Sequence, residues 1–152
     1  MGTKTGPRRV CPDQYPQFGT GRGACVLANA IGEDEESGRQ ARELRREHRE
    51  LAAPDLVDVA TTAVLRRRWL AGTTTDQRFE QAVEDLADIP LARFATLGLM
   101  RRAFELRVSV TAYDACYVAL AEALDWPLCT VDRRLAHASG PRCTMRLITL
   151  LG

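Results

Sequence analysis

Two aspartates in the C-terminal third of the chain have the residue type and spacing to do chemistry. Asp114 lies in the first turn of a predicted helix over residues 111–124, and Asp132 directly follows a short apolar run, Leu128–Val131. If this run is a strand beside the helix, both carboxylates converge at the C-terminal edge of a sheet, where open α/β sheets bind ligands. Hard divalent cations prefer converging carboxylates. The pair therefore indicates a metal site.

Each aspartate also has a purely structural interpretation. Thr111 and Asp114 fit a capping box, in which the aspartate returns to the backbone N–H of the threonine. Asp132 is a suitable N-cap for a predicted helix over Arg133–Ala138. Taken singly, each aspartate is more often a cap than a ligand. Together they frame a buried helix and strand, which favours the metal site while leaving the capping roles open.

The elements that must position these acids follow from the apolar pattern. The helix over residues 111–124 is apolar nearly all round, as expected for a buried helix. Asp125-Trp126-Pro127 ends it, and short apolar, β-branched runs predict strands at Leu128–Val131 and at about Met145–Leu150. Helices separated by short strands indicate a mainly parallel central sheet flanked by helices.

The middle of the chain continues this alternation. We expect extended segments at 51–54 and 89–94, and helices at 55–70, from 75 or 76 to about 87, and at 97–106. The core-facing stripe of the helix at 55–70 is predicted to be Leu56, Val59, Ala60, Ala63 and Val64. Residues 1–22 are rich in Gly, Pro and Thr and are predicted to be irregular. A single α/β domain over residues 23–152 is expected.

The balanced charge of the chain gives no overall signature of a nucleic-acid-binding protein. The 152 residues are 45% hydrophobic and 27% charged with a formal net charge of +1, so any contact with a polyanion must come from a local patch. The strongest patch is the basic run Arg66–Arg68 with Trp69. It is either a solvated helix end or a contact to RNA phosphates or an acidic partner segment, and the solvated end is favoured.

The cysteines indicate a reducing compartment. Five cysteines without CxxC spacing are typical of reduced, mostly buried thiols in a cytoplasmic protein. Two histidines give no zinc spacing. No apolar run approaches the length of a membrane span, and no apolar stretch typical of a signal peptide follows the N-terminal basic residues. No membrane association is expected.

The sequence T-A-Y-D-A-C-Y-V-A-L-A-E-A-L with P-L-C-T-V-D-R-R-L-A resembles the C-terminal half of a PIN-domain ribonuclease of the VapC type, the toxin of bacterial toxin–antitoxin pairs. The match is dense over residues 111–138 and continues more loosely back to about Gly23. The resemblance implies a PIN fold and a Mg²⁺- or Mn²⁺-dependent endoribonuclease with up to four acids around the metal. Asp114 and Asp132 fall on the third and fourth acid positions. The implied partners are an RNA substrate, a cognate antitoxin protein and a second copy in a homodimer.

The chain departs from this family pattern at the other two acids. Residues 23–31 resemble the apolar helix start that follows the family's first buried strand, which puts Gly23 where the family has its first aspartate. Counting from Pro54 puts Ala60 at the second acid position, and Asp58 lies roughly 200° away round the helix. The expected function is a VapC-like ribonuclease weakened by the loss of two ligands. The alternative is a catalytically inactive PIN scaffold that binds an antitoxin or dimer partner.

Overall fold

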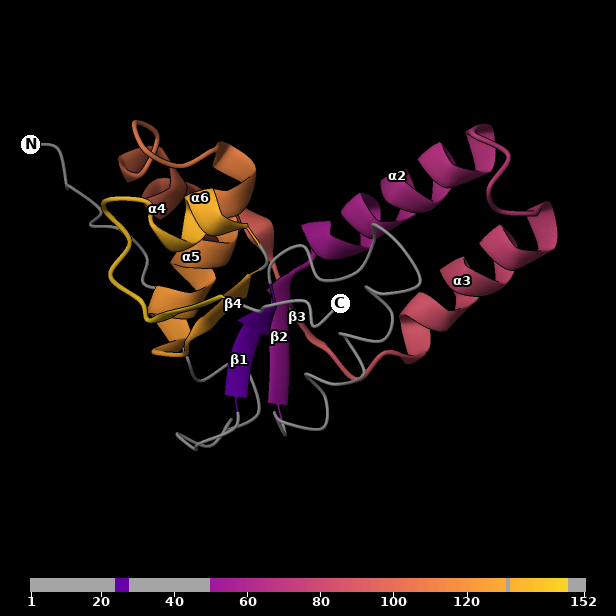
Figure 1. Cartoon of the computed structure of the whole chain (residues 1–152). Helices are drawn as coiled ribbons and strands as arrows, with labels where there is room; N and C mark the ends of the chain where they lie inside the picture. The colour runs from indigo at the N-terminus through magenta and orange to yellow at the C-terminus, as the bar shows by residue number, and fades with distance from the viewer. Residues whose placement is uncertain (1–23, 28–49, 131, 148–152) are drawn as a thin grey trace, which may run out of the picture.

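A five-stranded parallel sheet organises the chain. The computed structural model describes residues 24–27, 50–130 and 132–147 (Figure 1). The strand order is β3-β2-β1-β4-β5, and every recorded pair is parallel. The strands are β1 (Ala24–Leu27), β2 (Glu50–Pro54), β3 (Ala92–Phe94), β4 (Leu128–Thr130) and β5 (Met145–Leu147). The parallel α/β fold predicted from the sequence is confirmed, whereas the irregular segment 1–22 lies outside the described residues.

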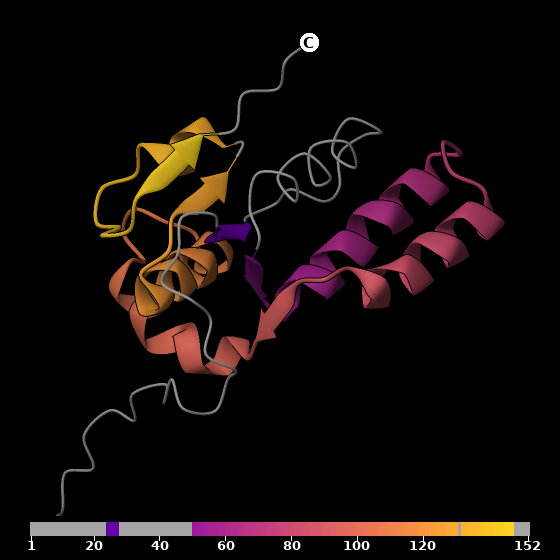
Figure 2. The same ribbon diagram turned by 90° about the horizontal axis from the view of Figure 1, so that it is seen from below.

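The helices form two groups. A long hairpin projects away from the sheet, and the remaining helices gather beside the strands (Figures 1 and 2). The hairpin is α2 (Leu56–Leu70) and α3 (Asp76–Asp88); the second group is the 3₁₀ helix η2 (Thr96–Leu99), α4 (Met100–Glu105), α5 (Ala112–Leu124) and α6 (Arg133–Ala136). No helix in the described part of the chain is long and apolar enough to cross a membrane.

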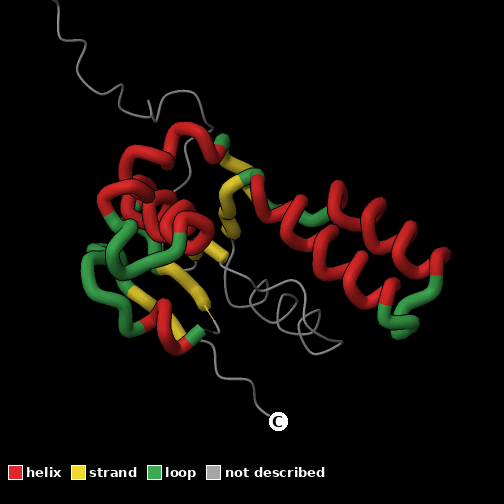
Figure 3. Tube along the Cα trace, turned by 90° about the horizontal axis from the view of Figure 1, so that it is seen from above, coloured by secondary structure: helices red, strands yellow, loops and turns green. Residues whose placement is uncertain are grey.

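The two groups of helices differ in how they contact the sheet. The chain moves from β1 to β2 to β3 in one direction, and then returns past β1 to β4 and β5. Helix α5 packs against β1, β2 and β4, and α6 packs against β4 and β5, whereas the α2–α3 hairpin extends beyond the sheet from the end of β2 (Figure 1). Figure 3 shows the separation of the hairpin from the other helices. The direction reverses between β1 and β4, and ligands bind at such switch points in open α/β sheets.

Helix α5 forms the centre of the core. Its residues 115–121 are all buried, and it packs against β1, β2 and β4. The predicted burial of this helix is confirmed, and its alanines allow its backbone to approach the sheet closely. Asp125 ends the helix in the left-handed region with φ 55°, and the Trp126 N–H donates to Ala121 O at 3.0 Å. This tight turn leads directly into β4.

The predicted core-facing stripe of α2 is only partly right. Leu56 packs against the core, whereas Val59 is 74% exposed and the fully buried residues of the helix are Val57 and Thr61. The buried threonine is stabilised because its hydroxyl donates to Val57 O at 2.8 Å, which satisfies its polar atom within the helix. A stripe chosen by hydrophobicity alone therefore missed the threonine that faces the core.

The expected helix start at residues 23–31 is also wrong where the chain is described. Ala24–Leu27 form β1, the central strand, which pairs with β2 on one side and β4 on the other. A short apolar run fits a helix or a doubly buried parallel strand equally well by periodicity. Gly23 lies outside the described residues, so its assignment to the first acid position stays an expectation from the resemblance.

The Glu122 carboxylate in α5 holds both α4 and the loop between α6 and β5 in place. Arg102 of α4 donates to Glu122 through Nε at 2.7 Å and Nη2 at 3.0 Å, and the Arg142 N–H donates to the same carboxylate at 2.8 Å. Burial alone would raise the pKa of Glu122, but the hydrogen bonds and positive charges of Arg102 and Arg142 outweigh it and lower that pKa. The ionised form is therefore the one that stabilises the fold.

Replacing Glu122 with Ala should cost about 2 kcal/mol of unfolding free energy, because it leaves the partly buried Arg102 without its main partner. The folded-state pKa of Glu122 lies below its ordinary value of 4.5, so the stabilisation is complete above that pH and is lost as pH falls below it. Urea denaturation at several pH values measures both effects. The matched control is Glu105→Ala, which removes a more exposed ion pair to Arg102 and should cost less than about 1 kcal/mol. Equal losses for both variants would contradict this role of Glu122.

Candidate metal and nuclease site

The topology places both predicted acids at one edge of the sheet. The C-terminal end of α5 adjoins the start of β4 through the tight turn at Asp125 and Trp126. A helix that connects parallel strands returns against the strand direction, so the first turn of α5 lies at the edge where the strands end. Asp114 is in that turn, and Asp132 follows the last residue of β4 by two positions. This is also the edge at which the switch point between β1 and β4 opens.

Asp114 is held by the residue that caps its helix. The Thr111 hydroxyl accepts from the Asp114 N–H at 3.1 Å and donates to Asp114 Oδ2 at 2.7 Å. The expected capping role is thus present in part, with the carboxylate bound to the threonine hydroxyl rather than to its backbone N–H. Among the described residues no hydrogen bond reaches Asp114 Oδ1. One oxygen is fixed in orientation while the other is available to a ligand.

Asp132 has a similar division between its two oxygens. Its Oδ1 accepts from the N–H groups of Arg134 and Leu135 at 2.7 and 3.4 Å, which confirms the predicted N-cap of α6. Its own N–H donates to the buried Thr130 hydroxyl at 3.0 Å. Within the described part of the chain, Oδ2 has no hydrogen-bond partner. Capping and ligand binding are therefore compatible at this residue.

A third carboxylate at the same edge was not selected from the sequence. Asp55 follows β2, its N–H donates to Phe94 O at 2.8 Å, and its Oδ1 accepts from the Thr96 N–H at 3.1 Å and from the Thr96 hydroxyl. Its charge, after burial, contributes to raising the pKa of the Cys116 thiol, which places Asp55 near the start of α5. The sequence pattern that selected Asp132 also applies to Asp55, because each aspartate follows a short apolar run.

Two tyrosines accompany Asp114 on α5. The Tyr113 and Tyr117 hydroxyls lie 3.0 Å apart, with ring centroids 5.3 Å apart. Burial, followed by the hydrogen bond to Tyr113, raises the pKa of Tyr117. Burial also raises the pKa of Tyr113, and the nearby charge of Asp114 contributes. Both phenols therefore stay neutral beside Asp114 and add no charge to the edge.

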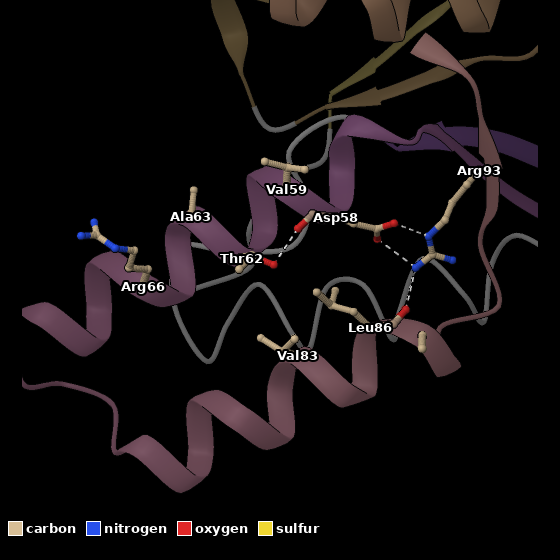
Figure 4. A pocket seen from close by; sticks show the side chains of 9 residues that line it. Asp58, Val59, Thr62, Ala63, Arg66, Val83, Leu86 and Arg93 are labelled. Carbon is tan, nitrogen blue, oxygen red and sulfur yellow. Dashed lines mark hydrogen bonds and ion pairs between the residues drawn. The ribbon is translucent and has the colours of Figure 1, made fainter.

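Ala60, which the resemblance puts at the second acid position, has no side-chain donor for a metal. Ala60 lies in the second turn of α2, and the neighbouring Asp58 is engaged by Arg93, with Nε to Oδ2 at 2.7 Å and Nη2 to Oδ1 at 3.0 Å (Figure 4). Arg93 also donates to Leu86 O at 2.6 Å, which ties β3 to the ends of both hairpin helices. Asp58 therefore helps to hold α2 and α3 together where the hairpin leaves the sheet. It also lines a groove of about 750 Å³ between these two helices. The expectation that Asp58 is a poor substitute for the missing acid agrees with this geometry.

The residues present fit a weakly held divalent cation. Asp114 and Asp132 offer hard oxygen donors, which suit Mg²⁺, and this ion is commonly bound through one or two carboxylates while keeping several waters. Across residues 24–27, 50–130 and 132–147, no group of three or more His, Cys, Asp or Glu side chains is arranged to hold a metal. A cation at this edge would therefore rest on fewer protein ligands than a site with four acids.

Comparisons with known proteins agree with the fold. The PIN domain model matches residues 24–141, which includes both acids and every strand except β5. Ribonuclease VapC9 of Mycobacterium tuberculosis is 38% identical over 112 residues, covering 72% of this chain and 85% of the relative. Ribonuclease VapC1 of the same species is 39% identical over 97 residues, covering 63% of this chain and 73% of the relative.

Two solved structures share the fold. VapBC2 from Rickettsia felis, bound to a DNA fragment from its promoter, superposes with a TM-score of 0.55 at 13% identity, covering 82% of this chain and 98% of that chain. PAE2754 from Pyrobaculum aerophilum gives the same TM-score at 20% identity, covering 82% and 83%. The parallel α/β fold is that of a PIN domain. Within that fold, the chain belongs to the family of VapC ribonucleases.

Proposed function

We propose that this chain is a metal-dependent endoribonuclease of the VapC kind, in which Asp114 and Asp132 bind Mg²⁺ or Mn²⁺ and turnover is low. The observation that supports the proposal is that Asp114 lies in the first turn of α5 and Asp132 follows β4, each with one oxygen that has no hydrogen-bond partner among the described residues. The family relationship supports RNA as the substrate.

The roles of the residues follow from their contacts. A bound divalent cation would lower the pKa of an attacking water and neutralise charge on the phosphate. Asp114, oriented by Thr111, and Asp132, oriented by the N-terminus of α6, would hold that ion through their remaining oxygens. The pairing of Asp58 with Arg93 keeps that carboxylate out of the site.

Titration of the purified chain with Mg²⁺ or Mn²⁺ tests the proposal, with cleavage of single-stranded RNA and metal binding by calorimetry as the two readouts. We expect weak binding and slow cleavage that both saturate with metal, because only two protein carboxylates supply ligands. Cleavage that persists unchanged in excess EDTA would contradict a metal-dependent site.

A catalytically inactive scaffold is the second candidate. It is favoured by the alanine at position 60 and by the lack of any described cluster of three potential ligands. Such a chain would bind its protein partners while showing no metal-dependent cleavage at any metal concentration. The titration above separates the two candidates.

We also propose three features of the cellular setting. The partner is a small antitoxin protein, which the fold shared with the toxin–antitoxin complex VapBC2 supports. The chain self-associates as a homodimer. It acts in the cytoplasm, where free thiols such as those of Cys116 and Cys129 stay reduced. Co-purification of the tagged chain from its native host, followed by size-exclusion chromatography, tests the first two features.

A further inference from the structure

We infer that Arg133 and Arg134 of α6, here called the α6 arginines, bind phosphates of the RNA strand and position it beside Asp132. The inference rests on the proposed function and names residues that hold the substrate without being metal ligands. Both arginines directly follow Asp132, the N-cap of α6, and both are exposed. A strand whose scissile phosphate lies at Asp132 would bring its neighbouring phosphates next to them.

The backbone of α6 is held without any contribution from the guanidinium groups. Asp132 Oδ1 accepts from the Arg134 N–H at 2.7 Å, and the Leu135 side chain is buried. At the other end of the helix, His137 Nδ1 lies 2.7 Å from Arg133 O. A carbonyl oxygen only accepts hydrogen bonds, so this ring nitrogen carries the proton and donates. The helix is thus anchored at its start, its middle and its end by other groups.

Neither α6 arginine has a carboxylate partner in the described part of the chain. The ion pairs among these residues involve other arginines, such as Arg102, whose Nε lies 2.7 Å from Glu122. Arg134 contacts Asp132 through its backbone N–H and not through its guanidinium group. A guanidinium group binds phosphate oxygens through two parallel hydrogen bonds. The α6 arginines therefore have the chemistry of an anion-binding surface.

The position of this surface favours an anion that also contacts the metal. Two cations that follow a proposed metal ligand repel Mg²⁺ and weaken its binding when nothing else is bound. A phosphate shared by the arginines and the metal removes this repulsion, and Mg²⁺ in proteins commonly combines one or two carboxylates with substrate phosphates. The juxtaposition therefore favours RNA as the occupant.

The other basic run of the chain lies farther from this edge. Arg66–Arg68 are near the end of α2, in the hairpin that projects away from the sheet (Figure 1). The exposed residues Arg66 and Arg78 of the hairpin therefore supply a matched control, in which two positive charges are removed away from Asp132.

Binding of a short fluorescent oligouridine to the whole chain in EDTA tests the surface without requiring cleavage. Arg133→Gln with Arg134→Gln should weaken binding on the order of tenfold at low salt, because two phosphate contacts are lost. The slope of log K against log salt should fall by about 1.4, since each single-strand phosphate contact contributes about 0.7. An oligoadenine probe should lose the same affinity, because phosphate contacts carry no base information. Arg66→Gln with Arg78→Gln should leave the affinity and the slope unchanged.

Metal binding separates this role from a structural one. If the α6 arginines only stabilised the helix, Arg133→Gln with Arg134→Gln would disturb Asp132 and weaken Mg²⁺ binding in calorimetry. We expect instead that Mg²⁺ binding without RNA is retained or tightens, because two repelling cations are gone, while KM for RNA rises more than kcat falls. Arg133→Lys with Arg134→Lys should recover part of the RNA affinity, since the charge remains while the bidentate geometry is lost.

Each contrary outcome has a clear meaning. Unchanged RNA affinity and salt slope in the double glutamine variant overturn the surface, as does a wild-type chain that binds neither probe. Equal weakening by the hairpin control means that overall charge binds the RNA, which also overturns it. If the double variant weakens binding of a co-purified protein and not of RNA, the arginines serve that protein and the inference is wrong. Failure of the metal titration, with the RNA-binding result intact, overturns the ribonuclease proposal and leaves this surface standing.

Discussion

Replacing Asp114 with Asn should reduce metal-dependent RNA cleavage by on the order of 100-fold, with little change in stability. The amide keeps an oxygen that can accept from the Thr111 hydroxyl, and the Asp114 N–H still donates to Thr111, so the start of α5 is preserved. The substitution removes the negative charge that binds the cation, and electrostatic groups of this kind contribute about 10²–10³ to rate. Single-turnover cleavage and calorimetric metal binding should fall together.

The same substitution at Asp132 provides a parallel test. Asn is as good an N-cap as Asp, so Asp132→Asn should retain α6 while losing cleavage, whereas Asp132→Ala should lose both and cost about 1 kcal/mol of stability. The double variant Asp114→Asn with Asp132→Asn should cleave RNA at about the same rate as either single variant, because ligands of one ion act as a unit and their losses do not add. Robust cleavage by the double variant would place the chemistry elsewhere.

Introducing a carboxylate at the second acid position should have the opposite effect. Ala60→Glu is expected to tighten Mg²⁺ binding roughly tenfold, which corresponds to about 1.4 kcal/mol, and to increase cleavage at low metal concentration. Ala60 lies in the second turn of α2, and helix side chains tilt toward the N-terminus. A glutamate there therefore points back toward the edge at which β2 ends and Asp114 lies.

The control for this gain is Ala63→Glu, which adds the same charge to α2 about 4.5 Å farther along the helix. It should leave metal binding unchanged. Adding Gly23→Asp to Ala60→Glu should contribute little, because Gly23 precedes β1 in sequence while the edge with the acids follows Leu27, roughly 13 Å farther along a strand of four residues. A large synergistic gain from this double change would show that β1 does not begin at Ala24 in the active protein.

The elements around Asp114 and Asp132 could be predicted because local signals agree there. Helix α5 is apolar nearly all round, its end carries the break at Asp125-Trp126-Pro127, and β4 is short and β-type in composition. Burial, capping and length all pointed to the same elements, so helix, turn and strand were assigned correctly. The side chains of Cys116 and Cys129 are buried as expected.

The misassigned elements are those in which two patterns compete. In α2, Val57 with Thr61 and Val59 with Ala63 both recur every four residues, and only tertiary packing decides which pair is buried. In β1, four apolar residues carry no period long enough to separate strand from helix. The resemblance then supplied a helix there, and it did so wrongly.

The metal site itself stays a prediction, while the local contacts of its two acids could be foreseen only in part. Asp114 and Asp132 were selected, but periodicity says nothing about which oxygen a cap occupies, and that detail decides whether a cap can also bind metal. Asp55 was overlooked because its partner Thr96 is distant in sequence and comes close only when β2 and β3 pair.

The central place of β1 has a consequence for how the protein folds. Val26 pairs with Leu128, on the order of 100 positions away, and contacts between such distant residues form slowly. The middle of the sheet therefore closes late in folding. Since Asp132 follows β4, the edge that carries this aspartate is completed only at that step, after the local helices have formed.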